Sequence, residues 1–258
     1  MATTFLFHDV IFGPVKSRRL GISLGINLSP THTKWCNYNC LYCECGWNPV
    51  AGSKPVLPSK EEVIQKLRET LVLMQEKGEK PDVITFSGNG EPTMHPSFEW
   101  IVDEVINLRN SFCSGARIAV LSNASLLHKE SVFRALQKVD DPILKLDSGG
   151  ERMSRIINQP AYPFDLEKHL QEMEKFEGNF ILQSIFLRGR YQEEMFDNTN
   201  EDELCRWMKH VKRLNPRKVM IYSLDRATPH PDLEKVSLEE LERIAQKLRS
   251  EGFDVQVA

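Results

Sequence analysis

Six strand-like stretches alternate with helical patterns along this 258-residue chain. In the first stretch every second residue is apolar, which predicts a strand with one buried face, built on Leu20, Ile22, Leu24, Ile26 and Leu28. The other five are short apolar runs, expected as strands at 82–87, 117–122, 143–146, 179–187 and 218–224. Strands that alternate with helices are typically parallel, because each crossover returns through a helix.

The helices between these strands are indicated by caps and by apolar spacing. Capping boxes open helices at 59–62 and 237–240, and Gly78 and Gly252 end them. Apolar residues at helical spacing predict further helices at 98–106, 132–139, 166–173 and 204–214. The stretch from Ser148 to about Pro163 shows no such pattern and is expected to be the longest loop, and 253–258 a last edge strand.

Six strand–helix units are too few to close an eight-stranded barrel. We therefore expect an α/β fold, an open and partial (β/α)6 TIM-like barrel. No linker, low-complexity stretch or repeat divides the chain, which predicts one domain over residues 1–258. Within it we expect a lead-in over 1–19 with a turn at Gly13–Pro14, a core over 20–230, and a C-terminal helix and edge strand over 231–258.

Composition limits the classes of protein that fit. The chain is 41% hydrophobic and 27% charged, as expected of a globular protein, and its net charge of −3 argues against a large nonspecific nucleic-acid surface. Its start has no basic segment before the short apolar run, and no apolar run reaches membrane-spanning length, so we expect neither a signal peptide nor a membrane protein.

Three of the 6 cysteines lie within eight residues, as Cys36, Cys40 and Cys43. Thiolates this close can converge on one metal centre. One interpretation is a zinc knuckle with Cys45 as the fourth ligand, which would make the chain a zinc-binding interaction module. The other is an iron–sulfur cluster with one iron left open for chemistry. Either way the thiolates must stay reduced, which predicts a cytoplasmic protein, and Cys113 and Cys205 are expected to be ordinary thiols near helices.

A glycine-rich turn follows the second predicted strand, with the sequence Gly88-Asn89-Gly90-Glu91. Glycines let the backbone approach a ligand closely, and Asn89 tolerates left-handed backbone better than most residues. Taken alone, the same four residues also fit a simple hairpin-like turn.

Polar residues stand near the ends of several predicted strands, where a (β/α) barrel carries its functional loops. They are Asn123, Asp147, Ser148, Gln183 and Ser223. Strand termination explains such residues equally well, and the strand that carries Gln183 can continue past it. Several arginines also fall in or near these loops and suggest an anionic substrate, namely Arg152, Arg155, Arg188, Arg190 and Arg226.

The Cys-x3-Cys-x2-Cys spacing, with Tyr42 before the third cysteine and the glycine-rich turn after the next strand, resembles the radical S-adenosylmethionine (SAM) superfamily. The resemblance implies that Cys36, Cys40 and Cys43 hold a 4Fe-4S cluster whose fourth iron binds SAM. It also implies that reductive cleavage of SAM gives a 5′-deoxyadenosyl radical that abstracts hydrogen from a substrate.

The same resemblance assigns roles to the other residues. It places the backbone of Tyr42 at the adenine of SAM and the turn of Gly88, Asn89, Gly90 and Glu91 at the methionine amino group, although this family usually has glycine where Asn89 stands. Polar residues ending the fourth and fifth strands bind the ribose and the carboxylate in this family, and Asp147 is the best candidate for the ribose.

A narrower resemblance covers nearly the whole chain. Residues 13–43, Leu146-Asp147-Ser148-Gly149 and Leu224-Asp225-Arg226 look like small radical SAM proteins related to the wyosine tRNA-base synthases. This implies a tRNA nucleoside as substrate, with a protein or peptide as the alternative, and a flavodoxin or ferredoxin as electron donor. The tRNA enzymes carry extra N-terminal cysteines, and residues 1–35 here contain none. If the lead-in folds across the barrel mouth, Arg18 and Arg19 are expected to contact the substrate.

Overall fold

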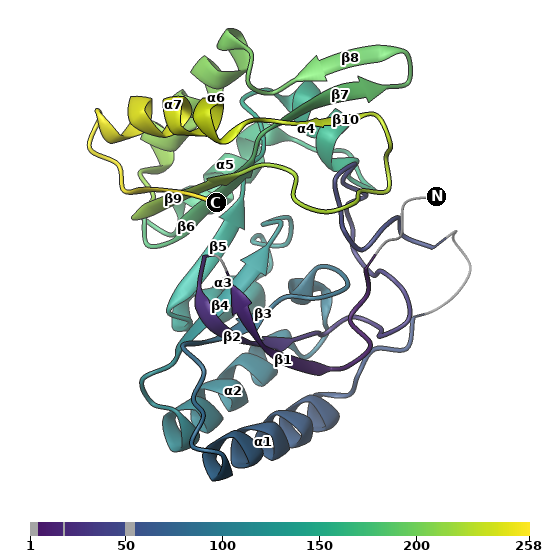
Figure 1. The fold of residues 1–258 in the computed structure, drawn as a ribbon, viewed down its shortest axis with the longest axis vertical. Helices are drawn as coiled ribbons and strands as arrows, with labels where there is room; N and C mark the ends of the chain where they lie inside the picture. The colour runs from purple at the N-terminus through teal and green to yellow at the C-terminus, as the bar shows by residue number, and fades with distance from the viewer. Residues whose placement is uncertain (1–4, 18, 50–54) are drawn as a thin grey trace. The chain divides into compact units, whose positions relative to one another are not determined.

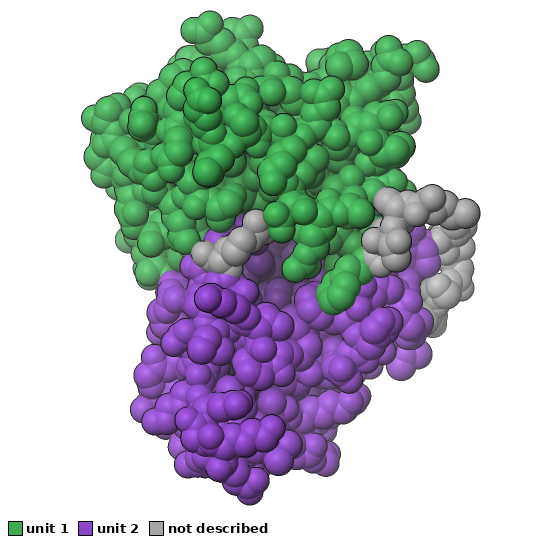
Figure 2. Space-filling view, in the orientation of Figure 1, with its two compact units in different colours: residues 1–5, 37–47, 143–258 green, residues 6–36, 48–142 purple. Residues whose placement is uncertain are grey.

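The computed structural model describes residues 5–17, 19–49 and 55–258, and these divide into two compact units (Figure 2). The N-terminal unit comprises residues 6–36 and 48–142, and the C-terminal unit comprises residues 1–5, 37–47 and 143–258. The chain therefore passes between the units twice around the cysteine motif. The expectation of one domain over the whole chain stays a prediction.

The N-terminal unit contains four strands of the main sheet and three helices. In this sheet β1 (Ile11–Ser17) is antiparallel to β2 (Gly21–Ile26), while β3 (Val83–Phe86) and β4 (Arg117–Ser122) continue it in parallel. Helix α2 (Phe98–Phe112) contacts both α1 (Lys60–Glu76) and α3 (Glu130–Lys138) (Figure 1). A short 3₁₀ turn, η1 (Pro92–Met94), follows the glycine-rich turn.

The C-terminal unit contains parallel strands of the main sheet and a separate antiparallel sheet. Strand β5 (Asp141–Lys145) leads into this unit and pairs with β6 (Ile181–Ile185), which pairs with β9 (Lys218–Tyr222), and β9 pairs with β11 (Val255–Val257). The helices are α4 (Glu151–Asn158), α5 (Leu166–Glu174), α6 (Glu201–Leu214) and α7 (Leu238–Arg249).

The antiparallel sheet is a hairpin with one added strand. Strands β7 (Leu187–Tyr191) and β8 (Glu194–Asp197) form the hairpin, and β10 (Leu233–Lys235) pairs with the other side of β7 (Figure 1). Strand β8 is consequently an edge strand of this sheet.

The six predicted strands and the capped helices are confirmed. Ser59 caps α1 through its hydroxyl, and Ser237 and Glu240 form a complete capping box on α7. Burial agrees with the predicted core, since every residue of β3 and β6 is buried. Ile22 is the exception in the first strand, because its side chain is 45% exposed.

Two local expectations were wrong. The expected long loop after Ser148 contains helix α4, whose eight residues are too few to show a helical apolar pattern. Gly13–Pro14 does not mark a turn, because both residues lie inside β1, where the pairing with β2 is irregular between Phe12 and Val15. A bulge tolerates a proline that a regular ladder excludes.

No helix in the described part of the chain is long and apolar enough to cross a membrane.

Candidate functional site

The glycine-rich turn of the N-terminal unit is fastened to the residue before Cys36. Trp35 donates its backbone N–H to the carbonyl of Asn89, and its own carbonyl accepts the N–H of Glu91, at 2.8 and 3.1 Å. A Cβ added at Gly90 would lie 1.7 Å from the Trp35 carbonyl oxygen, so only glycine fits there. The turn and the start of the cysteine motif are thereby held together.

Replacing Gly90 by alanine is expected to lower the free energy of unfolding by at least about 2 kcal/mol, because the added methyl forces the backbone apart. Gly115→Ala is the matched control, since an added Cβ there meets no atom within 4 Å, and it should change stability by less than about 0.5 kcal/mol. Thermal unfolding of both variants measures the difference. Equal melting temperatures would show that the contact does not constrain the turn.

Asn89 supports the glycine-rich turn through its side chain. It is not among the residues with positive φ, so left-handed backbone does not explain its presence. Its side chain is buried, donates to the carbonyls of Phe7 and Pro30, and accepts the N–H of Phe7. Asn89 therefore ties the lead-in to the turn through its side chain.

Glu91 is a buried carboxylate with four hydrogen bonds. Oε1 accepts from the backbone N–H and hydroxyl of Thr93 and from the hydroxyl of Ser122, and Oε2 accepts the N–H of Asn123 at 2.7 Å. Burial raises the pKa of Glu91 above its ordinary value, although these hydrogen bonds oppose the shift. The carboxylate links the turn after β3 to the end of β4.

Asn123 connects this end of β4 to Cys36. Its side-chain Nδ2 lies 3.6 Å from the Cys36 sulfur, and its Oδ1 accepts the N–H of Ser125. Asn48 fixes the Cys36 backbone from the other side, because its amide both accepts the Cys36 N–H and donates to the Cys36 carbonyl. Asn48 lies outside the cysteine motif, and nothing in the sequence around it indicated this role.

A buried polar cluster of the C-terminal unit surrounds Tyr42. The Tyr42 hydroxyl donates to Asp147 Oδ2 at 2.5 Å and accepts from the Lys145 ammonium at 2.7 Å. Burial and then the nearby Asp147 raise the pKa of Tyr42 well above its ordinary value. Burial lowers the pKa of Lys145, but the negative groups Cys40 and Asp147 outweigh it, and the pKa lies above its ordinary value.

Asn158, at the end of α4, completes this cluster. Its Nδ2 donates to Asp147 Oδ2 at 2.7 Å and lies 3.5 Å from the Cys40 sulfur. With Ile185 N–H on Oδ1, Asp147 accepts three hydrogen bonds within the C-terminal unit. A carboxylate has roughly four acceptor sites, so about one remains for a ligand. Asn158 was missed because it falls in the stretch expected as a loop.

Helix α4 also holds the cysteine loop by its backbone. The carbonyls of Asn158 and Gln159 accept the N–H of Asn39, and the carbonyl of Ile157 accepts the N–H of Leu41. The residues on both sides of Cys40 are therefore held by the end of α4.

The remaining candidates have local partners. Ser148 bonds Ser154 in α4, and the Ser223 hydroxyl donates to the Phe186 carbonyl and accepts the N–H of Val236. Gln183 lies within β6 and is buried, so its strand does continue past it. Four of the five arginines named from the sequence form ion pairs inside the C-terminal unit, namely Arg152, Arg155, Arg188 and Arg226.

The contact of Arg19 with a substrate stays a prediction. Arg19 is half-buried in the turn between β1 and β2, at the N-terminal end of β2. Cys36 follows the opposite, C-terminal end of the same strand. The lead-in does reach the glycine-rich turn, but through Phe7 rather than Arg19. Arg18 lies outside the described residues.

His95 connects η1 to the start of α2. Its Nδ1 accepts the Ser97 N–H at 3.1 Å, so its Nε2 carries the proton and donates to the Pro58 carbonyl at 3.0 Å. Burial lowers the pKa of His95 from its ordinary value of 6.5, and burial lowers that of His169 in the C-terminal unit.

The free energy of unfolding is expected to fall as the pH drops below about 6.5. At that pH the unfolded chain binds protons at these two histidines, whereas the folded chain, in which their pKa values are lowered, does not yet bind them. His95→Gln should flatten this dependence, while His128→Gln, which changes an exposed histidine, should not. Melting temperatures from pH 7.5 to 5.5 test this. A wild-type slope in His95→Gln would rule out a contribution from His95.

The surroundings of the three thiols of the cysteine motif fit an iron–sulfur cluster. Cys36, Cys40 and Cys43 form no disulfide, and carboxamide N–H groups face two of the sulfurs, as expected for cluster thiolates. Among the described residues, no three His, Cys, Asp or Glu side chains are grouped to hold a single metal ion. Cluster thiolates bind different irons, so this finding concerns single-ion sites only.

A family model described as the radical SAM superfamily matches residues 31–175, which is more than half of the chain. A UPF0026 protein of Helicobacter pylori is 30% identical over 223 residues, covering 84% of this chain and 67% of its own length. A UPF0026 protein of Methanocaldococcus jannaschii is 33% identical, over 81% of this chain and 61% of its own. A Brachyspira hyodysenteriae protein named GTPase Obg is 30% identical over 90% of this chain, which spans only 32% of that protein.

Solved structures show the same fold. A radical SAM methyltransferase from Sphaerobacter thermophilus superposes with a TM-score of 0.69 at 14% identity, covering 92% of this chain and 65% of that one. The structure of TYW1 with a lysine-pyruvate adduct superposes with a TM-score of 0.63 at 17% identity, covering 90% of this chain and 74% of that one. The structure of Streptococcus suis SuiB bound to the precursor peptide SuiA superposes with a TM-score of 0.62 at 13% identity, covering 91% of this chain and 48% of that one.

These similarities confirm the predicted partial (β/α)6 barrel. They also set the zinc-knuckle interpretation aside, because the cofactors of this family are a 4Fe-4S cluster and SAM. The chain belongs to the radical SAM superfamily and is an enzyme of that class.

Proposed function

We propose that this chain uses Cys36, Cys40 and Cys43 to hold the 4Fe-4S cluster and cleaves SAM reductively, and that the radical abstracts hydrogen from a bound substrate. The observation that carries the proposal is the pair of carboxamide contacts, Asn123 to Cys36 and Asn158 to Cys40. A zinc knuckle does not need buried donors placed at two of its sulfurs by side chains 87 and 118 residues away.

When bound, the cluster and SAM supply the electron and the carbon radical. The chain itself supplies binding and orientation. Gly88 and Gly90 let the turn pack closely against Asn27 and Trp35, and Glu91 fixes the turn against β4. Tyr42, held by Asp147 and Lys145, places the loop between Cys40 and Cys43. We assign the remaining acceptor site of Asp147 to a ribose hydroxyl of SAM.

The substrate needs a separate argument. A tRNA nucleoside is the prediction from the wyosine-synthase resemblance. Four arginines of the C-terminal unit are already paired with carboxylates, however, and a polyanion favours unpaired cations. We therefore propose the other predicted class, a protein or peptide. A flavodoxin or ferredoxin as electron donor and a reducing cytoplasmic location are parts of the same proposal.

Deuterium transfer tests the proposal. Reduced protein is incubated with SAM and a deuterated lysate that has been separated into RNA, protein and small-molecule fractions. Deuterium in 5′-deoxyadenosine is expected with the protein fraction. Unlabelled 5′-deoxyadenosine with every fraction would contradict hydrogen abstraction, and label from the RNA fraction alone would restore the tRNA prediction.

Asn158→Leu is expected to make the cluster harder to reduce, because it removes an N–H that stabilises negative charge on the Cys40 sulfur. A weak hydrogen bond of ~0.5–1 kcal/mol corresponds to roughly 20–40 mV for one electron. Potentiometric titration followed by electron paramagnetic resonance measures the shift. Asn179→Leu, an exposed change in the same unit, should leave the potential unchanged. An unaltered potential in Asn158→Leu would show that the contact does not act on the cluster.

A further inference from the structure

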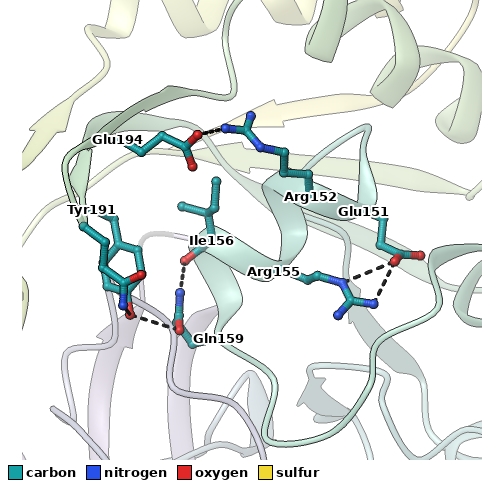
Figure 3. Close-up of a pocket in the computed structure, with 8 residues that line it drawn as sticks. Glu151, Arg152, Arg155, Ile156, Gln159, Tyr191 and Glu194 are labelled. Atoms are coloured by element: carbon teal, nitrogen blue, oxygen red, sulfur yellow. Dashed lines mark hydrogen bonds and ion pairs between the residues drawn. The ribbon is translucent and has the colours of Figure 1, made fainter.

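A polar cleft of about 430 Å³ lies within the C-terminal unit, between α4 and the β7–β8 hairpin (Figure 3). The wall formed by α4 and the residue after it presents charged and amide side chains together with Ile156. The hairpin presents Tyr191, Gln192 and Glu194. Figure 3 shows the labelled side chains of the two walls approaching one another across the opening.

The charges of this cleft are balanced and easily exchanged. Arg152 of α4 pairs with Glu194 of β8, and Arg155 pairs with Glu151. The side chains of the first pair are 70% and 48% exposed, and such surface pairs contribute about 0–1 kcal/mol. A ligand that carries both an acid and a base can therefore replace the Arg152–Glu194 pair at little cost. A polyanion would leave both glutamates unpaired and facing phosphate.

Strand β8 adds an open backbone edge beside the cleft. A two-residue turn, Gln192–Glu193, closes the hairpin on the hydrogen-bonded pair Tyr191–Glu194. In the next pair the N–H and C=O of Met195 consequently turn away from β7. Met195 is also 64% exposed, which is unusual for an apolar residue on a strand edge. Extended peptides bind such edges by adding a strand.

Unusual backbone geometry is concentrated here. Of the six non-glycine residues with positive φ in the described chain, Gln159, Gln192 and Glu193 line or adjoin this cleft. Such residues gather at ligand-binding sites because the surrounding structure must hold them in place. The Tyr191 hydroxyl bonds the Gln159 side chain, and the Gln159 carbonyl accepts the N–H of Asn39 in the cysteine loop. A ligand in the cleft thus touches a residue that contacts the cysteine motif.

We propose that this cleft and the β8 edge bind an extended polypeptide segment with an acidic and a basic side chain at alternate positions. The segment adds to β8 through Met195, so its side chains i and i+2, about 6.6 Å apart, both face α4. The acid pairs with Arg152 and the base with Glu194. This inference rests on the proposed function, for which it specifies the substrate class.

A library of random seven-residue peptides displayed on phage, panned on the full chain without SAM or reductant, tests the proposal. Peptides with an acid and a base two positions apart are expected to be enriched. Synthetic copies should lose at least tenfold in affinity on Arg152→Gln and on Glu194→Gln, measured by fluorescence anisotropy. Lys175→Gln, which breaks an exposed ion pair on α5, is the matched control and should bind normally.

The double variant Arg152→Glu/Glu194→Arg separates recognition from misfolding. It keeps an ion pair at the cleft but reverses its direction, so it should prefer peptides with acid and base in the opposite order. Enrichment without this charge pattern, or an unchanged preference in the double variant, would overturn the proposal. Arg152-dependent binding of a single-stranded RNA oligonucleotide in place of peptides would also overturn it. If the wild-type protein binds the peptides as proposed but does not cleave SAM, the result contradicts the proposed function and leaves the peptide site standing.

Discussion

Replacement of Cys36, Cys40 or Cys43 by alanine is expected to abolish both the iron–sulfur cluster and the cleavage of SAM. In the proposed arrangement each of the three thiolates would hold a different iron, so loss of one would leave too few ligands to retain the cluster. Anaerobic reconstitution followed by iron and sulfide analysis should give background values for all three variants. Production of 5′-deoxyadenosine should fall to the level without enzyme.

Cys45→Ala provides the internal control, because the fourth iron of the cluster is assigned to SAM rather than to a protein thiol. Iron content and SAM cleavage should stay near wild type. Cys205→Ala removes an exposed thiol on α6 and controls for the chemical change itself. Loss of the cluster in Cys45→Ala alone would reject the assignment of the three ligands.

Asp147→Asn is expected to lower both the melting temperature and the affinity for SAM. The carboxylate accepts bonds from Tyr42, Asn158 and the Ile185 N–H, and an amide in its place directs donors at donors. Leaving such a buried group unsatisfied costs roughly 1–3 kcal/mol. Loss of one charge-assisted bond to a ribose hydroxyl costs about 1.5–3 kcal/mol, or roughly ten- to a hundredfold in affinity.

Calorimetric SAM titration of reconstituted Asp147→Asn, beside its melting curve, separates the two effects. Cluster content should not change, because Asp147 is not assigned as a ligand. Asp202→Asn, an exposed change in the first turn of α6, should alter neither property. Wild-type affinity with a lowered melting temperature would reject the ribose role and leave Asp147 only as the support of Tyr42.

The sequence was sufficient to predict the strands and helices that show apolar periodicity or a capping residue. The strands β2, β3, β4, β5, β6 and β9 follow from apolar alternation or apolar runs, and helices such as α7 follow from apolar spacing and from Ser237 with Glu240. Helix α4 and the β7–β8 hairpin were not predictable in this way. The first is too short to display a period, and the second is closed by Gln192 and Glu193 instead of the glycine or asparagine that marks such turns.

The candidate site likewise contains a part that local sequence predicts and a part that it does not. The cysteines and the glycine-rich turn are local in sequence, so the resemblance to the radical SAM superfamily, which implies a cluster that binds SAM, can be recognised from them. The supporting contacts join residues far apart in the chain, such as Asn158 with Cys40 and Asn89 with Phe7. Tertiary structure sets those pairs, and nothing in the local sequence around Lys145 or Asn158 reveals them.

The most direct measurement is the formation of 5′-deoxyadenosine from SAM by anaerobically purified, reduced protein of known metal content. The predicted result is a brown protein with about four irons and four sulfides per chain that converts SAM to 5′-deoxyadenosine and methionine. A colourless protein that contains zinc and leaves SAM intact under the same reduction would contradict the assignment of a radical SAM active site to these residues.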